Sequence, residues 1–524
     1  SMEELKFNYK KTIFVGLAFF SITMFWQTYD SLIAKILIDK FGLSQGFSGV
    51  IMALDNMLAI FMLPLFGLLS DRTKSKFGRR TPYIVLGTII AAVTFMSLSF
   101  IDNKQTQFVE DLGIVADYEL VYEDVITKEN PTRADWDLIF IAINDEKLTD
   151  RYHNIITDSN GNLYEETRIL NSFEQRDIAD VYYVSLSDRA WAETKNDPTN
   201  LIVFMVVLFI GLIAMSVYRT PAVALMPDVT IRQFRSKANA VINLLGSAGA
   251  VVSIGIMTVF GLSNKSYVGY TPAFIATGAL MLVALMVFLL TVNENKLVEE
   301  YDETIRKHNL IDEPEEEVVT EGRFNQSRKG SLILILISVF LWFMGYNAVI
   351  SKLSDYAPKQ LNMNFTLPLL VAQGAAIVSF IPIGMLSSYF GRKKMILIGV
   401  ILLTICFGSA FFLTASTGWL LYVVLAFTGI AWATINVNSF PMVVELASGE
   451  EVGKYTGYYY TFSMAAQIIT PIFSGVLMDI FGRKVLFPYA AFFVVLALVT
   501  MIFVKHGDVK PAKTGILESF DVED

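Results

Sequence analysis

Twelve apolar runs, each long enough to cross a lipid bilayer, alternate with polar stretches along the chain. A helix needs about 20 apolar residues to cross the hydrocarbon core, and a soluble core would not use twelve such runs in succession. The pattern therefore predicts an all-α membrane protein with spans at 12–37, 47–69, 82–101, 200–222, 237–261, 270–292, 331–352, 365–388, 395–415, 418–441, 456–478 and 486–504.

The runs fall into two groups of six, separated by a polar segment at 294–330 that is rich in glutamate. A short motif recurs after the second span of each group, as Gly67-x3-Asp71 leading to Gly78-Arg79-Arg80 and as Gly384-x3-Ser388 leading to Gly391-Arg392-Lys393. Such a recurrence is typical of two related bundles. We expect the first bundle at 1–101 and 200–293, a partly helical linker at 294–330, the second bundle at 331–505 and a tail at 506–524.

Basic residues gather in the loops on one side of the predicted spans. They follow spans two, four and eight and precede span one, and such loops face the cytoplasm in membrane proteins. We therefore expect both termini to be cytoplasmic, in a multi-pass protein of the plasma (inner) membrane. Arg483 and Lys484, between the last two spans, fall on the other side and are the one clear exception.

Residues 102–199 form a polar insert between spans three and four, which the same loop count places outside the cytoplasm. Residues 101–200 hold 22 acidic and 9 basic side chains. Apolar residues alternate in Val121–Ile126, Leu138–Ile143 and Val181–Leu186, and Asp158–Asn162 is a strong turn signal. We expect a small β-rich (α+β) domain. Its one Asn-x-Thr triplet, at Asn130, is disqualified by proline, consistent with a bacterial source.

The overall composition agrees with a membrane protein, since 54% of residues are hydrophobic and 17% are charged, against about 25% charged in soluble proteins. Cys406 is the single cysteine, so no intrachain disulfide can form. No metal, nucleophile or phosphate motif is present in the insert. We expect no enzymatic activity, no metal or other cofactor, and no nucleic-acid partner.

The stretch Ser70–Ile84 resembles the second cytoplasmic loop of the glycoside–pentoside–hexuronide:cation symporters, a group within the major facilitator superfamily. Thr220–Asp228 and Arg235–Ala240 resemble the passage from span four to span five in the sucrose/maltose transporter-like branch. The resemblance covers most of the two bundles and leaves out the insert. It implies a major facilitator fold and a sugar carried by alternating access.

The loop motif has a physical rationale of its own. Gly67 would let spans two and eleven approach closely, as small residues do between membrane helices. Asp71 can pair with an arginine of the same loop, and Gly78 supplies a turn. The resemblance implies a latch that closes the cytoplasmic side, and plain anchoring of the arginines at the lipid surface is the alternative. The candidate gate residues are Gly67, Asp71, Arg72, Gly78, Arg79, Arg80, Asp228, Gly391, Arg392 and Lys393.

Polar residues at membrane depth are candidates for function, because burying them in lipid is expensive. Asp30 lies inside span one, four residues after Trp26 and thus on the same helix face. A carboxylate beside an aromatic ring suits a sugar, so Asp30 is the first candidate for a substrate or proton site; pairing with Lys35 is the alternative. The full candidate set is Trp26, Gln27, Tyr29, Asp30, Asp55, Asn56, Arg219, Tyr346, Asn347, Gln373, Trp432, Asn436 and Gln467.

Three positions at which this sequence differs from the related sugar carriers bear on the identity of the coupling ion. The sodium-coupled melibiose carriers keep aspartates at positions that Leu63 and Ala59 occupy here, which disfavours sodium. The sucrose carriers keep a coupling aspartate where Leu212 stands. Asp30 and Asp55 remain protonatable, so a proton is the expected coupling ion.

The sequence thus predicts a monomeric secondary transporter in the lipid bilayer that moves a sugar or glycoside, most simply a disaccharide. An exporter of lipids or drugs on the same scaffold is one alternative. A sensing or binding protein that acts through an unidentified external partner of residues 102–199 is another.

Overall fold

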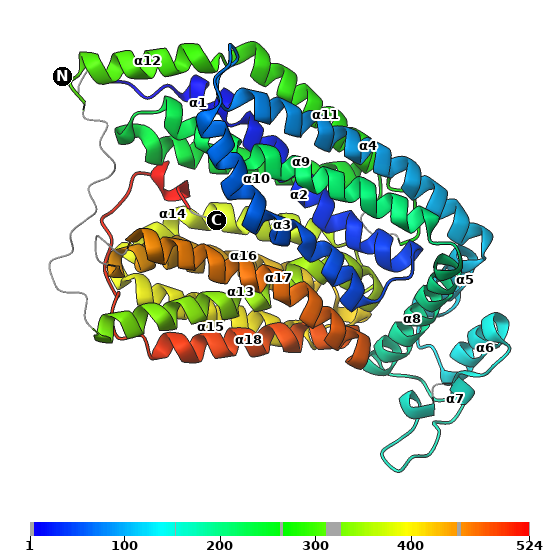
Figure 1. Cartoon of the computed structure of the whole chain (residues 1–524). Helices are drawn as coiled ribbons and strands as arrows, with labels where there is room; N and C mark the ends of the chain where they lie inside the picture. The colour runs from blue at the N-terminus through cyan, green and yellow to red at the C-terminus, as the bar shows by residue number, and fades with distance from the viewer. Residues whose placement is uncertain (1–4, 152, 263–265, 311–325, 448–451, 523–524) are drawn as a thin grey trace.

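The computed structural model describes residues 5–151, 153–262, 266–310, 326–447 and 452–522. In these residues, twelve helices are long and apolar enough to cross a membrane, and each overlaps one of the twelve predicted runs. The chain is a multi-pass membrane protein whose spans form two side-by-side bundles (Figure 1).

The first six spans form the N-terminal half, drawn from blue to green in Figure 1. Their apolar side chains share one hydrophobic core, which extends from Val15 to Val292. Span one combines α1, α2 and a π-helical turn at Ile36–Lys40. The helices are α1 (Tyr9–Val15), α2 (Leu17–Lys35), α3 (Gln45–Arg72), α4 (Thr81–Asp111), α9 (Thr199–Val229), α10 (Arg235–Val259) and α11 (Thr271–Thr291).

The last six spans form the C-terminal half, which has a separate core extending from Leu332 to Val504. Two cores of this kind explain why the spans divide six and six, since each half buries its own apolar stripes. The helices are α13 (Gln326–Gln360), α14 (Thr366–Phe390), α15 (Arg392–Ala410), α16 (Leu420–Leu446), α17 (Val452–Phe481) and α18 (Leu486–Ile502).

The linker between the halves begins with α12 (Glu294–Lys307), which fits the expected partly helical segment. Residues 311–325 of the predicted linker lie outside the described residues. After α18 the tail is irregular until a short 3-10 turn at Glu518–Phe520.

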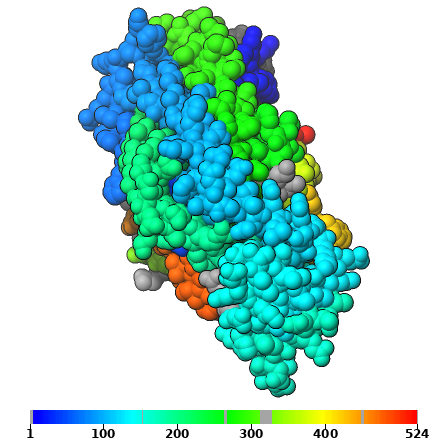
Figure 2. Space-filling model, turned by 90° about the vertical axis from the view of Figure 1, so that its right-hand side faces the viewer, coloured from blue at the N-terminus to red at the C-terminus, as the bar shows by residue number. Residues whose placement is uncertain are grey.

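The insert packs on one end of the two bundles, the insert end (Figures 1 and 2). The loops of Gly78 and Gly391 lie at the opposite end, the motif end. The insert has its own small core, built around Trp136, Phe140 and Tyr182. Its helices are α5 (Ile114–Val121), α6 (Arg133–Asn144), α7 (Leu148–Arg151) and α8 (Ser172–Asn196), with a π-helical turn at Tyr122–Ile126 and a 3-10 turn at His153–Ile155.

The prediction of a β-rich insert is wrong. Among the described residues of the insert there is no strand, and β-pairing is limited to two isolated bridges, Thr132 with Ile169 and Thr157 with Leu163. The stretch Val121–Ile126 starts on the last residue of α5 and continues as a π-helical turn, and Leu138–Ile143 and Val181–Leu186 lie in helices.

Helix-start signals outweigh the local alternation of apolar residues in the insert. The Thr132 side chain and Asp135 form a reciprocal cap at the start of α6, and the Asn171 side chain caps α8 by accepting from the N–H of Glu174. Such caps stabilise a helix start by about 0.5–2 kcal/mol. The turn predicted at Asp158 is present, because its carboxylate accepts from the N–H groups of Asn160 and Asn162.

The two halves meet most closely at the insert end, where α3 crosses α17. A side chain at Gly49 would overlap the backbone of Pro471, and one at Gly475 would overlap that of Gln45. Glycine at these positions therefore lets the two helix backbones touch, as small residues do between membrane helices.

Replacing Gly49 with alanine should force α3 away from α17. Overpacking of this kind costs about 1–3 kcal/mol, so the Tm in detergent should fall. Gly457→Ala is the matched control, because a β-carbon at Gly457, on α17 itself, meets nothing within 4 Å. An unchanged Tm for Gly49→Ala would contradict the close crossing.

Candidate functional site

A cavity of about 1190 Å³ lies between the two halves. It is lined by α2, α3, α9 and α10 from the N-terminal half and by α13, α14, α16 and α17 from the C-terminal half. Its volume exceeds the range of about 300–1,000 Å³ that is usual for small-molecule sites. Eleven of the thirteen candidate residues line it: Trp26, Gln27, Asp30, Asp55, Asn56, Arg219, Tyr346, Gln373, Trp432, Asn436 and Gln467.

The N-terminal half supplies the charged groups of the cavity. Asp30 comes from α2, Asp55 from α3 and Arg219 from α9. The Asp55 carboxylate accepts from the backbone N–H and the amide of Asn56, at 2.8 and 3.3 Å. The alternative was that Lys35 pairs with Asp30. In the structure the Lys35 ammonium instead forms an ion pair with Asp39 at 3.7 Å. Asp30 instead lies on the cavity wall.

The C-terminal half supplies aromatic rings and amides. Trp432 stacks on Tyr346, with ring centroids 3.7 Å apart and planes within 5°. Phe343 meets the same indole edge-on at 5.0 Å. Both rings of the stack line the cavity, together with the amides of Asn436, Gln373 and Gln467.

Two candidate residues do not line the cavity. Tyr29 is fully buried and donates to the backbone oxygen of Met52 at 3.4 Å. Its ring packs edge-on against Trp26 at 5.3 Å, so it supports a residue of the cavity wall. The Asn347 amide donates to the oxygen of Phe343 on its own helix. These two residues were chosen as polar residues at membrane depth, which does not show the face of the helix on which a side chain lies.

At the insert end the halves are joined by the buried ion pair of Lys359 with Asp39. Toward the motif end the lining continues to Asn239 and Phe380 and is met by Val522 of the tail. There the tail bridges the halves. The Asn243 amide donates to the oxygens of Phe520 and Val522, each at 2.9 Å, and the Phe520 ring packs against Phe380.

The first loop motif forms a compact ion cluster at the motif end. Asp228 at the end of α9 accepts from Arg79 and Arg80, each at 2.8 Å. The expected pairing of Asp71 with an arginine of the loop is present, to Arg80 at 2.7 Å. Burial opposes the charge on Arg80, but its hydrogen bonds to Asp228 and Asp71 outweigh this and raise the pKa of Arg80. Arg72 is exposed.

Glu294, the first residue of α12, completes this loop and was not foreseen from the sequence. Its carboxylate accepts from the N–H groups of Arg79, Arg80 and Thr81 and from the Thr81 hydroxyl, at 2.6–3.2 Å. It therefore caps the start of α4. Gly78 has a φ of +104°, and a side chain there would overlap Glu294. The only sequence signal was an acidic residue at a helix start.

The second loop motif repeats this arrangement. Gly391 has a φ of +95°, and a side chain there would overlap Asp508. Arg392 pairs with Glu445 at the end of α16 at 3.0 Å, as Arg79 and Arg80 pair with Asp228 at the end of α9. Lys393 follows in the first turn of α15. The sequence repeat is thus also a repeat in three dimensions.

Gly67 does not bring spans two and eleven together in this conformation. A side chain there would meet Thr220 of α9 at 3.0 Å. Helices α3 and α17 touch at the other end, through Gly49 and Gly475. In this conformation the close approach of Gly67 is to α9, since spacing shows that a close approach exists without showing which helix makes it.

Residues 189–383 and 358–519 match the Major Facilitator Superfamily, and residues 14–109 match the family described as MFS/sugar transport protein. These matches cover more than half of the chain. The chain belongs to the major facilitator superfamily, and its twelve helices in two bundles agree with that assignment.

Two relatives match parts of the sequence. The Escherichia coli (strain K12) protein YagG, provisionally named a glycoside/cation symporter, is 33% identical over 95 residues, 17% of this chain and 21% of that protein. The uncharacterized MFS-type transporter MJ1560 of Methanocaldococcus jannaschii is 25% identical over 171 residues, 32% of this chain and 44% of that protein. The chain thus matches less than half of either relative.

Solved structures resemble the whole chain. The partially occluded inward-open xylose transporter XylE from E. coli has a TM-score of 0.52 at 16% identity, covering 96% of this chain and 99% of that one. A D-xylose-proton symporter has a TM-score of 0.53 at 15% sequence identity, and the match covers 96% of this chain and 100% of that one. A mutant of the nucleoside transporter NupG has a TM-score of 0.52 at 12% sequence identity, and the match covers 95% of this chain and 100% of that one. At such identities the likeness shows the fold.

Removing the Glu294 carboxylate should destabilise the protein, because three backbone N–H groups would lose their acceptor. Leaving buried donors unpaired costs about 1–3 kcal/mol, so Glu294→Ala should lower the Tm in detergent. Glu299→Ala, on the exposed side of the same helix, should leave it unchanged. Equal Tm values for the two variants would show that Glu294 does not hold the loop.

Proposed function

We propose that the chain is a secondary transporter that takes up a sugar or glycoside by alternating access, coupled to protons. The observation that carries the proposal is the cavity between the halves, where carboxylates from one half face an aromatic surface and amides from the other. Binding at such an interface suits carriers whose halves rock around a central site.

The chemistry of the cavity wall suits a polyhydroxylated ligand. The Trp432–Tyr346 stack lines the cavity and can receive the C–H face of a pyranose ring, and the amides and carboxylates can bind its hydroxyl groups in both hydrogen-bond directions. The volume of about 1190 Å³ leaves room for more than one sugar ring, which favours a disaccharide or a glycoside.

Proton coupling would use Asp30, with Asp55 as a second carboxylate on the same wall. A carboxylate with few water neighbours holds a proton more readily than one in water. Protonation would accompany sugar binding from one side, and loss of the proton would accompany release on the other. The proposal assigns the motif end to the cytoplasm, because the basic loops lie there.

Asp30→Asn should abolish uphill uptake while sparing exchange, because the amide can still bind hydroxyls but cannot release a proton. The measurement is sugar uptake into proteoliposomes under an inward proton gradient, beside counterflow without a gradient. Asp55→Asn is the companion variant. Undiminished uphill uptake by Asp30→Asn would exclude Asp30 as the coupling group. Loss of uphill uptake in Asp55→Asn alone would assign the coupling role to Asp55.

Trp432→Ala should weaken sugar binding by about tenfold, which corresponds to roughly 1.4 kcal/mol. The check is the Kd of the sugar that stabilises the wild-type protein most in a thermal-shift screen of mono- and disaccharides. Trp419→Ala is the matched control, because Trp419 directly precedes the same helix but is 65% exposed and is not among the residues that line the cavity. Similar affinities for both variants would contradict the aromatic subsite.

A further inference from the structure

The loop after α17 carries a third copy of the loop motif, at the opposite end of the molecule. Gly475-x3-Asp479-x2-Gly482-Arg483-Lys484 has the spacing of Gly384-x3-Ser388-x2-Gly391-Arg392-Lys393. The loop includes Arg483 and Lys484, the exception to the distribution of basic residues. These two charges are explained if the loop forms an ion cluster at the insert end, as the other two copies form ion clusters at the motif end.

The geometry of the third copy matches the other two. Gly482 has a φ of +92°, and a β-carbon there would lie 2.8 Å from the carboxylate of Asp180. The same carboxylate accepts from the backbone N–H of Arg483 at 3.2 Å. Glu294 and Asp508 occupy this position in the motif-end copies. The acid that completes the third copy comes from α8, and thus from the insert.

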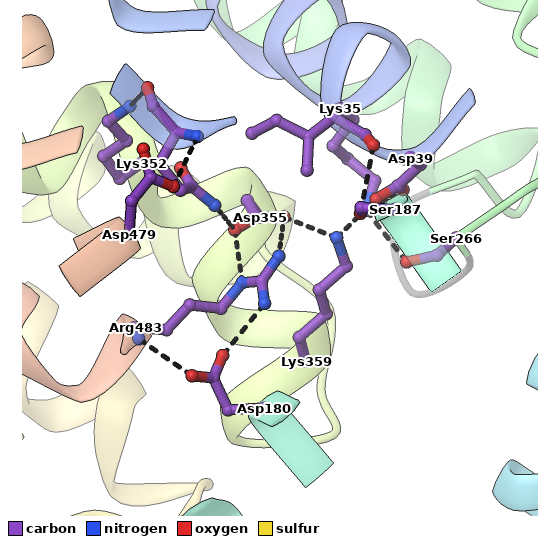
Figure 3. A network of polar contacts seen from close by, with 12 residues as sticks. Lys35, Asp39, Asp180, Ser187, Ser266, Lys352, Asp355, Lys359, Asp479 and Arg483 are labelled. Atoms are coloured by element: carbon purple, nitrogen blue, oxygen red, sulfur yellow. Dashed lines mark hydrogen bonds and ion pairs between the residues drawn. The ribbon is translucent and has the colours of Figure 1, made fainter. Parts of the chain in front are cut away.

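Arg483 lies at the centre of a buried chain of ion pairs between three parts of the molecule (Figure 3). It binds Asp180 of the insert at 2.9 Å and Asp355 of α13 at 2.7 Å. Asp355 binds Lys359 at 2.6 Å, and Lys359 binds Asp39 of the N-terminal half. None of these five side chains is more than 11% exposed.

The rest of the third copy joins the two halves directly. The Asp479 carboxylate accepts from the N–H groups of Gln45 and Gly46, both at 2.9 Å, and so caps the start of α3. Lys352 of α13 donates to the Gln45 oxygen at 3.0 Å. Opening the molecule at the insert end would break these bonds together with the chain of ion pairs.

Helix α8 also crosses from one half to the other. Near its start, Arg176 donates to the backbone oxygen of Phe411 in the C-terminal half at 2.7 Å. Further along, the Ser187 hydroxyl donates to the oxygen of Ile38 in the N-terminal half at 3.2 Å. A side chain at Gly42 would overlap the backbone of Ser187 and Trp191. The helix is therefore in contact with both halves.

We propose that the insert is part of the gate at the insert end: α8 straps the two halves together, and Asp180 completes the third loop motif by holding Arg483. Weakening this strap shifts the protein toward the state that is open at the insert end. The insert thereby sets the balance between the two access states, whatever the cargo.

The strap is tested by the distance between the halves at the insert end. Spin labels are attached at Phe47→Cys on α3 and Trp419→Cys at the start of α16, both exposed, in a Cys406→Ala background. The full chain is measured in nanodiscs without substrate. Asp180→Asn and Arg176→Gln each remove one contact of the strap with the C-terminal half. Asp177→Asn is the matched control, since it breaks the half-exposed pair with Lys484 one turn away.

Asp180→Asn and Arg176→Gln should each raise the long-distance population by about tenfold, the effect of losing one charged hydrogen bond. Asp177→Asn should leave the distribution as in the wild type. An unchanged distribution in Asp180→Asn, or an equal shift in Asp177→Asn, overturns the proposal. If Asp180→Asn cannot be purified, Arg176→Gln alone decides. The labels report conformation without a cargo, so failure here is separate from failure of sugar transport.

Discussion

A charge that leaves water for an apolar interior has to find its partner there, since an unpaired buried charge is strongly destabilising. This constraint governs the insert end, where three buried acidic and four buried basic side chains gather between the halves: Asp39, Asp180, Asp355, Lys35, Lys352, Lys359 and Arg483. They come from both bundles and from the insert, and the exposed Asp479 adds a fourth acid. The contact between the halves depends on this cluster and on the glycines that let α3 and α17 touch.

The same local solution serves at both ends of the molecule. A glycine in the left-handed region turns the chain, an acidic side chain from elsewhere accepts from the backbone beyond it, and an arginine reaches a second acid. Alternating access requires two closed ends of similar stability, because a large difference would trap one state. In the proposed cycle the same kind of motif is available at both ends, within each half at the motif end and against the insert at the insert end.

Much of the fold could be predicted because it follows from one-dimensional patterns. The twelve spans and their division at 294–330 need only apolar length and repetition. The cavity wall was found through polar residues at membrane depth, which places Asp30 and Trp432 on opposite halves of one site. Tyr29 and Asn347 were misplaced, because a polar residue in a span can face a neighbouring helix or bond within its own.

What could not be predicted depends on contacts between distant segments. Glu294, Asp180 and Asp508 carry no local signal that links them to Gly78, Gly482 and Gly391, since folding alone brings each pair together. The insert was predicted as β-rich because short alternating stretches fit a strand and a helix equally well. The helix caps at Thr132 and Asn171 favour helices there.

The position of the tail has a practical consequence for anyone who handles the protein. Asn243 holds Phe520 and Val522 beside the cavity, and Asp521 accepts from Ser236 of the same helix at 2.8 Å. Any polypeptide joined after this point, including a purification tag or a fluorescent fusion, starts next to Val522, which lines the cavity. A tag joined ahead of α1 avoids that position.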